Sequence, residues 1–227
     1  MMKKHYFFSA ILLVLTLFSC KKDNSIDFHF EYFGMEEGRY IIYDVVEIVH
    51  DDALNQHDTA VYQLKTYWAD TFVDNQGRPA REFWRYVRPT SNDPWVLQDI
   101  WTGVHDGIRA ELVEENQRVV KLVFSPTQNK EWDANAYNMN GEQICYYRDI
   151  HGDTTIDNTS FDPTLVVEQD QFNSLIDSVR RYEMYAKGIG MILKYERDLH
   201  YQINNQSQIY LNEGTERYYR FVETGIE

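Results

Sequence analysis

The sequence predicts a mainly β protein: a single antiparallel, curved sheet or barrel-like domain that follows a cleaved signal peptide. Short runs of β-branched and aromatic residues recur along most of the chain, and aromatic residues make up 15% of it. Clusters of Asn, Asp, Ser, Gly and Pro separate these runs, which favours hairpins between neighbouring strands. A barrel, a sandwich and an open curved sheet all satisfy this pattern.

Residues 1–19 form the first element and have the pattern of a secretory signal peptide. A short basic stretch with Lys3 and Lys4 precedes the uncharged, mostly apolar run Tyr6 to Phe18. This run is shorter than the ~20 apolar residues that span a bilayer. We therefore expect export and cleavage before Cys20 rather than a transmembrane helix.

The residues at the cleavage site resemble the lipobox of bacterial lipoproteins. Leu17, Ser19 and Cys20 match it, and Phe18 is bulkier than the residue usual at its position. The resemblance implies that a diacylglyceryl group is attached to Cys20 and that the new amino terminus is acylated. Several acyl chains on one residue hold a protein persistently on a membrane, so the membrane is the first expected partner.

The mature chain reads as a short lipidated tether, residues 20–26, followed by one antiparallel β domain, residues 27–227. The formal net charge is −14, and removal of Lys3 and Lys4 with the leader makes it −16. A charge of this sign repels phosphate backbones, so we expect no nucleic-acid partner. Only Cys145 remains after lipidation of Cys20, which excludes an internal disulfide.

The domain is predicted to contain strands wherever apolar and polar residues alternate or β-branched residues dominate. These segments are Arg39 to His50, Val61 to Trp68, Glu82 to Arg88, Val119 to Phe124, Gln143 to Ile150, Thr164 to Glu168, Met191 to Arg197, Gln208 to Leu211 and Tyr218 to Glu223. The turn-forming segments are Asp74 to Gly77, Ser91 to Pro94, Asn138 to Gly141 and His151 to Asp153.

Two further segments have a local signature. Gln169 to Arg181 has Phe172, Leu175, Ile176 and Val179 at helical spacing, which predicts one short helix near 169–181, with a long extended loop as the alternative. In Tyr185 to Gly190 two glycines flank an isoleucine. This favours a structural turn, because no helix follows and the lysine precedes the glycines, unlike a phosphate loop.

Catalytic and metal sites have no clear signature. His50, Asp51, Asp52, His57 and Asp58 cluster, but an acidic hairpin loop explains them better than a metal site. His105 and Asp106 are adjacent, yet the chain lacks a G-x-S-x-G nucleophile motif. We therefore assign no catalytic residue, metal or cofactor, and catalysis is less expected than binding.

Trp95 and Trp101 are the candidate ligand contacts. They lie six residues apart, so both indoles point to one face of an extended strand that has no bulge. Two indoles on one face form either a core layer or an exposed platform for a ligand.

Several segments resemble uncharacterised lipoproteins of Bacteroidota, and Tyr185 to Gly190 is also similar to an element of the lipoprotein-carrier curved-sheet fold. The resemblance implies a location in the cell envelope, at the outer membrane, with the periplasmic and surface faces both open. It also implies O-glycosylation at Asp-Ser/Thr triplets, which here gives Thr59, Thr154 and Ser178. The segments that carry it are Gly38 to Tyr40 with Tyr43, Tyr62 to Lys65, Ala69 to Phe72, Lys121 to Phe124 and Tyr185 to Gly190.

Three functions are compatible with these features. The leading hypothesis is a membrane-anchored binding or structural module with an unknown protein or small-molecule ligand. A carrier that shelters a lipid acyl chain would need a continuous apolar cavity. A surface hydrolase would need convergent acids or a nucleophile–base pair.

Overall fold

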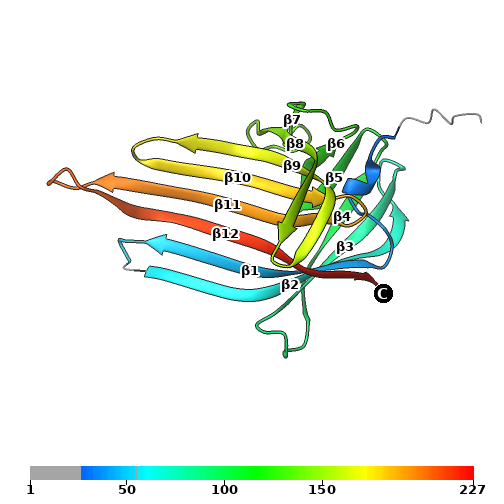
Figure 1. Ribbon diagram of the computed structural model, residues 1–227, viewed down its shortest axis with the longest axis horizontal. Coiled ribbons are helices and arrows are strands. Elements are labelled where there is room, and N and C mark those ends of the chain that lie inside the picture. Colours follow the sequence, from blue (N-terminus) through cyan, green and yellow to red (C-terminus); the bar gives the residue numbers. More distant parts are fainter. Residues whose placement is uncertain (1–26, 55) are drawn as a thin grey trace, which may run out of the picture.

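The computed structural model describes residues 27–54 and 56–227, which form one 12-stranded antiparallel sheet (Figure 1). This confirms the predicted mainly β fold, and the sheet is nearly closed and barrel-like. A single 3₁₀ turn, η2 (Phe30–Tyr32), precedes the sheet. The strands are β1 (Arg39–Asp51), β2 (Gln56–Val73), β3 (Pro79–Arg88), β4 (Val96–His105), β5 (Arg109–Glu114), β6 (Gln117–Val123), β7 (Glu131–Asp133), β8 (Ile144–Ile156), β9 (Thr159–Asn173), β10 (Asp177–Ala186), β11 (Gly190–Ile203) and β12 (Ile209–Ile226).

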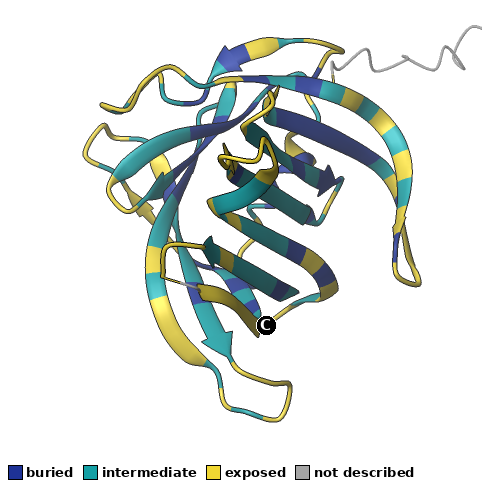
Figure 2. Ribbon diagram, turned by 90° about the vertical axis from the view of Figure 1, so that its left-hand side faces the viewer, coloured by how far each residue is buried: buried dark blue, intermediate teal, exposed yellow. Residues whose placement is uncertain are grey.

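The strands form an antiparallel meander. Its first strand, β1, and its last strand, β12, pair with each other in the middle of the sheet. The order is β6-β5-β4-β3-β2-β1-β12-β11-β10-β9-β8-β7, so the first and last strands pair with each other, from Arg39 opposite Ile226 to Asp51 opposite Glu213. The two edge strands, β6 and β7, follow each other in the sequence. Since their connection is short, the sheet must curl until its edges approach, as Figure 2 shows.

Backbone and side-chain groups of residues 132, 134 and 147 form hydrogen bonds with the backbone at the edge of β6. The Val120 amide donates to the Ala134 carbonyl at 2.9 Å, and the Trp132 indole N–H donates to the Val120 carbonyl at 3.0 Å. The buried Tyr147 hydroxyl contacts both the N–H and the C=O of Val123 at 2.9 Å. These bonds protect an edge that would otherwise expose unpaired backbone groups.

The amino-terminal segment covers one end of the curled sheet. Tyr32 and Phe33 are buried, and the Phe33 ring lies 5.5 Å from the Trp68 indole in the larger of two core clusters. Gly34 passes so close to the β10–β11 turn that a Cβ at this position would lie 2.2 Å from the Ile189 carbonyl oxygen. A side chain there would push the segment away from the core. The predicted turn at Tyr185 to Gly190 is confirmed, with positive φ at Gly188 and Gly190.

The predicted helix over Gln169 to Arg181 is wrong, because the segment is the β9–β10 hairpin. Phe172 and Val179, two of its four apolar positions, lie opposite each other in the strand ladder. Leu175 and Ile176 lie at the tip, where Leu175 is 73% exposed. The helical spacing arises because the four apolar residues are distributed over two paired strands and their turn.

The predicted turn at His151 to Asp153 is also wrong. These residues lie inside β8, where the pairing with β9 shifts at Ile150/Gly152 and again at Gly152/Thr154. Two bulges absorb the turn-forming residues, and His151 has a φ of 55°. The chain reverses instead at 157–158. The two strands predicted near the carboxyl terminus are parts of one strand, β12. No strand was predicted at β4, β5, β7 or β10, and the first half of β10 was assigned to the helix.

Candidate functional site

The structure separates the two predicted ligand-contacting tryptophans. Along β4 the pairing with β3 shifts between Arg85/Tyr86, so that Gln98 is an extra residue. Because of this extra residue, Trp95 and Trp101 point to opposite faces of the sheet. The shared face expected for an unbroken strand is therefore wrong for this pair.

Only Trp101 faces the interior of the curled sheet. Its indole lies under the Arg85 guanidinium at 4.0 Å and helps to line a small cavity of about 70 Å³. Its Nε1 is buried and has no hydrogen-bond partner in the described part of the chain. Trp95 instead packs against the Arg88 guanidinium at 4.1 Å. Trp101 therefore remains a candidate ligand contact.

The remaining predicted positions lie apart from this cavity. Cys20 lies outside the described residues. Thr59 is exposed on β2, Thr154 is half-buried on β8, and Ser178 on β10 is half-buried and donates a hydrogen bond to the Asn173 side chain at 2.9 Å. The three candidate glycosylation residues therefore lie on strands, and only Thr59 has an open environment.

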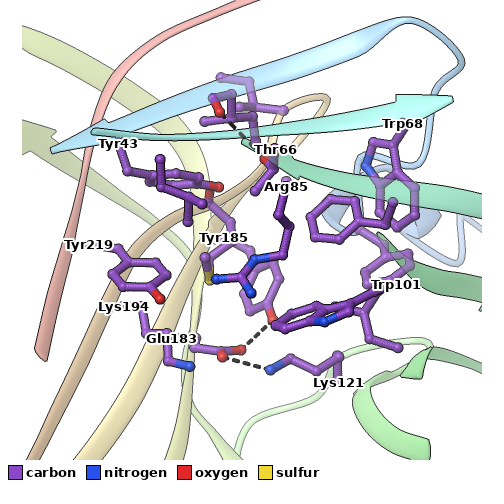
Figure 3. A pocket seen from close by; sticks show the side chains of 18 of the residues that line it. Tyr43, Thr66, Trp68, Arg85, Trp101, Lys121, Glu183, Tyr185, Lys194 and Tyr219 are labelled. Carbon is purple, nitrogen blue, oxygen red and sulfur yellow. Dashed lines mark hydrogen bonds and ion pairs between the residues drawn. The ribbon is translucent and has the colours of Figure 1, made fainter. Parts of the chain in front are cut away.

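The interior contains a buried ion pair that sequence reasoning missed. The Lys121 ammonium on β6 lies 2.7 Å from a carboxylate oxygen of Glu183 on β10, and the Tyr185 hydroxyl donates to the other oxygen at 2.5 Å (Figure 3). Lys121 also lies 3.5 Å from the Glu114 carboxylate on β5. Glu183 is 1% exposed, so these partners replace all of its hydration.

A β-bulge directs Lys121 into this position. Ala110 pairs with Leu122 and Glu111 pairs with Val120, which leaves Lys121 as the extra residue of β6. Bulges re-aim side chains and are frequent beside functional sites. The one sequence signal was the single charge, Lys121, inside the otherwise apolar run Val119 to Phe124.

The pKa values of Lys121 and Glu183 are both shifted in favour of the charged forms. Burial alone would raise the pKa of Glu183, but the Lys121 and Lys194 ammonium charges and the hydrogen bonds from Lys121 and Tyr185 outweigh it and lower the pKa to about 2. For Lys121 burial acts to lower the pKa, and the charges of Glu183 and Glu114 reverse the effect, so that its pKa is raised. Both groups are therefore ionised at neutral pH.

Lys194 extends the cluster along the sheet. Its ammonium group lies 3.0 Å from the Glu196 carboxylate, and the Arg217 guanidinium lies 3.3 Å from the other Glu196 oxygen. Arg217 in turn contacts Glu47 at 2.5 Å. Side chains of alternating charge thus cross β11, β12 and β1 in adjacent positions of the ladder.

An open recess of about 350 Å³ adjoins the small cavity at this cluster. Lys121, Glu183, Lys194 and Glu114 line both spaces. The recess as a whole presents four carboxylates and three cations together with amide side chains. Its polar lining consists of Glu114, Glu183, Glu196, Asp198, Lys121, Arg181, Lys194, Asn135, Asn140, Gln143, Gln169 and Thr215.

The described residues contain neither a hydrogen-bonded nucleophile–histidine pair nor a metal-binding group of three or more side chains. Within residues 27–54 and 56–227, no Ser, Thr or Cys side chain is hydrogen-bonded to a histidine, and no group of three or more His, Cys, Asp or Glu side chains is arranged to hold a metal ion. Burial raises the pKa of the Cys145 thiol to about 12, which makes it a poor nucleophile.

No helix in the described part of the chain is long and apolar enough to cross a membrane. Compared with protein families, with curated proteins and with solved structures, the chain gives no match.

Proposed function

We propose that this protein is a lipid-anchored binding module of the cell envelope, and that its recess binds a small polar ligand carrying both a positive and a negative group. The observation that carries the proposal is the buried Lys121–Glu183 pair at the junction of cavity and recess. Buried ion pairs contribute little to stability relative to apolar residues of similar volume. Ionised groups kept at a cavity are therefore candidates for a binding role.

The mixed charge of the lining indicates the ligand class. Carboxylates and cations alternate over the floor of the recess, so a ligand with one charge sign meets repulsion as well as attraction. A zwitterion of amino-acid size can satisfy both signs at once. The recess volume of about 350 Å³ lies at the lower end of the roughly 300–1,000 Å³ typical of small-molecule sites.

The two alternative functions find less support. An acyl-chain carrier needs a long apolar cavity, whereas the cavity at Trp101 measures about 70 Å³ and has charged residues in its wall. A glycan hydrolase of the two-carboxylate type needs a general acid whose pKa is raised toward neutrality, whereas the pKa of Glu183 in this recess is lowered to about 2.

The anchor follows from the sequence at Cys20. Seven residues, 20–26, precede the described domain, and an extended chain of this length reaches at most about 25 Å. The binding domain would therefore stay close to the membrane surface, and we place it at the outer membrane.

Two neighbouring arginines on β10 allow a matched test. Arg181 lines the recess and lies 2.6 Å from Asp198, whereas Arg180 lies on the opposite face of the strand, 3.7 Å from Glu168. Both side chains are 34% exposed. We would measure the thermal stability of the full protein in detergent with a panel of free amino acids, betaines, neutral sugars and fatty acids.

We expect a zwitterionic compound to raise the melting temperature of the wild type and of Arg180→Gln, and to raise that of Arg181→Gln less. Stabilisation by fatty acids alone, or a fatty acid retained in native mass spectrometry, would favour the carrier instead. Equal responses of the two variants would remove the recess as the binding site.

A further inference from the structure

Two histidines face each other across the β1–β2 hairpin, near the end of β1 and the start of β2. His50 and His57 are directly opposite in the ladder, and their Nδ1 atoms lie 3.3 Å apart. The His50 side chain is 16% exposed, and His57 is exposed to solvent. The two nitrogens therefore meet at the surface, where an ion and its waters have access.

The neighbouring strand determines which nitrogen of His50 is free. The Nε2 atom is buried and makes no hydrogen bond within the described residues. A carboxylate oxygen of Glu216 on β12 lies 3.5 Å from it, and the Tyr218 hydroxyl donates to the other oxygen of Glu216 at 2.9 Å. A carboxylate at this position favours the ring proton on Nε2. The lone pair of His50 Nδ1 is then directed toward His57.

The separation of the two Nδ1 atoms matches the bite of a tetrahedral metal ion. Two imidazole nitrogens bound at about 2.0–2.1 Å with a tetrahedral angle are roughly 3.3–3.4 Å apart. A square-planar ion holds adjacent nitrogens closer, at roughly 2.9 Å. The observed 3.3 Å fits the tetrahedral case.

We propose that His50 and His57 form a two-histidine site for a divalent transition-metal ion of tetrahedral preference, Zn²⁺ or Co²⁺, with water in the remaining positions. Glu216 acts as the outer carboxylate that orients the ligating His50, an arrangement that recurs at protein metal sites. The ion would replace the single hydrogen bond between the rings and join β1 to β2 beside their turn. This site is separate from the recess and does not depend on the function proposed for it.

Titration of the untagged full protein in detergent with Zn²⁺, followed by calorimetry, tests the proposal. Co²⁺ provides a second measurement, because four-coordinate Co²⁺ absorbs visible light far more strongly than the six-coordinate aqueous ion. We expect one equivalent of each metal to bind the wild type. His57→Gln should weaken binding at least tenfold, and Glu216→Gln should weaken it by about tenfold or more, as outer-carboxylate losses do at other sites.

His200→Gln is the matched control, because His200 is also a surface histidine flanked by carboxylates, with Asp177 at 2.8 Å and Asp198 at 3.3 Å. It should bind Zn²⁺ as the wild type does. Equal affinity of the wild type and His57→Gln, loss of binding in His200→Gln, or a six-coordinate Co²⁺ spectrum would each overturn the assignment. Because His57 is exposed, its replacement should leave the melting temperature of the metal-free protein unchanged, which separates lost binding from misfolding.

Discussion

Replacing Lys121 with methionine removes the ammonium group that balances Glu183 inside the curled sheet. The two groups are 2.7 Å apart, and Glu183 is 1% exposed, so little of its hydration can be restored when the ammonium group is lost. Methionine has nearly the same length, which limits the effect of lost packing. Breaking a buried pair in this way costs about 3–5 kcal/mol, because it leaves an uncompensated buried charge.

The pH dependence of the free energy of unfolding gives a second value for the stability that the ion pair contributes. The pKa of Glu183 falls from its ordinary value of 4.5 to about 2 in the folded protein, which corresponds to about 3 kcal/mol of stability. Since the folded-state pKa is the lower one, this stability is present above pH 4.5 and is lost as the pH falls toward 2. In Lys121→Met, burial still acts to raise the pKa of Glu183, and the ammonium charge of Lys121 no longer opposes it. The stability lost relative to the wild type should therefore be smaller in acid.

Both effects can be measured by urea unfolding at pH 7 and pH 3.5. The proteins to compare are the wild type, Lys121→Met, Glu183→Gln and the double variant. The double variant should recover part of the loss, because both charges are absent. The reasoning fails if Lys121→Met lies within about 1 kcal/mol of the wild type at pH 7. It also fails if Glu183→Gln loses as much stability between the two pH values as the wild type does.

Three other changes have expected outcomes. Gly103→Ala should lower the free energy of unfolding by about 1–3 kcal/mol, because its Cβ would lie 2.3 Å from the Trp68 ring. Tyr147→Phe should cost about 1–3 kcal/mol and speed amide exchange at Val123, whose N–H and C=O lose their partner. The Cys145 thiol, whose pKa burial raises to about 12, should resist a thiol reagent at pH 8 in the folded protein and react in denaturant.

Each of these changes has a control. Gly141→Ala should be neutral, because nothing lies within 4 Å of its Cβ, and an equal cost at both glycines would contradict the steric argument. Tyr210→Phe removes a hydroxyl that donates to the exposed Gln202, so a loss as large as that of Tyr147→Phe would contradict the role given to β6. Two reactive thiols in denaturant, rather than one, would show that Cys20 carries no lipid.

The fold class was predictable because strand alternation and turn chemistry are local properties. Val61 to Trp68 and Glu82 to Arg88 were both assigned correctly, as β2 and β3, and the turn at Asp74 to Gly77 joins them. The two wrong secondary-structure predictions, the helix and one turn, have the same cause. In Gln169 to Arg181 and in His151 to Asp153, pairing with a neighbouring strand overrode the local pattern.

The candidate site was not predictable in this way. Lys121 and Gln169 are extra residues at bulges, where the strand pairing shifts by one position, and both line the recess. A bulge reverses which face each following residue occupies, so alternation counted along the sequence gives the wrong face beyond it. Trp95 and Trp101 were placed on one face for the same reason.

The sequence by itself therefore determined the properties that neighbouring residues decide: most of the strands and most of the turns. The signal peptide and the lipid site at Cys20 lie outside the described residues and stay predictions. Only the tertiary structure decided how the sheet curls and which charges meet inside it. Lys121 and Glu183 lie 62 positions apart in the chain, and their contact exists because β6 and β10 face each other across the interior of the curled sheet. A charge has no assigned partner in a linear sequence, and burial, which gives this pair its energetic significance, is a property of the folded chain alone.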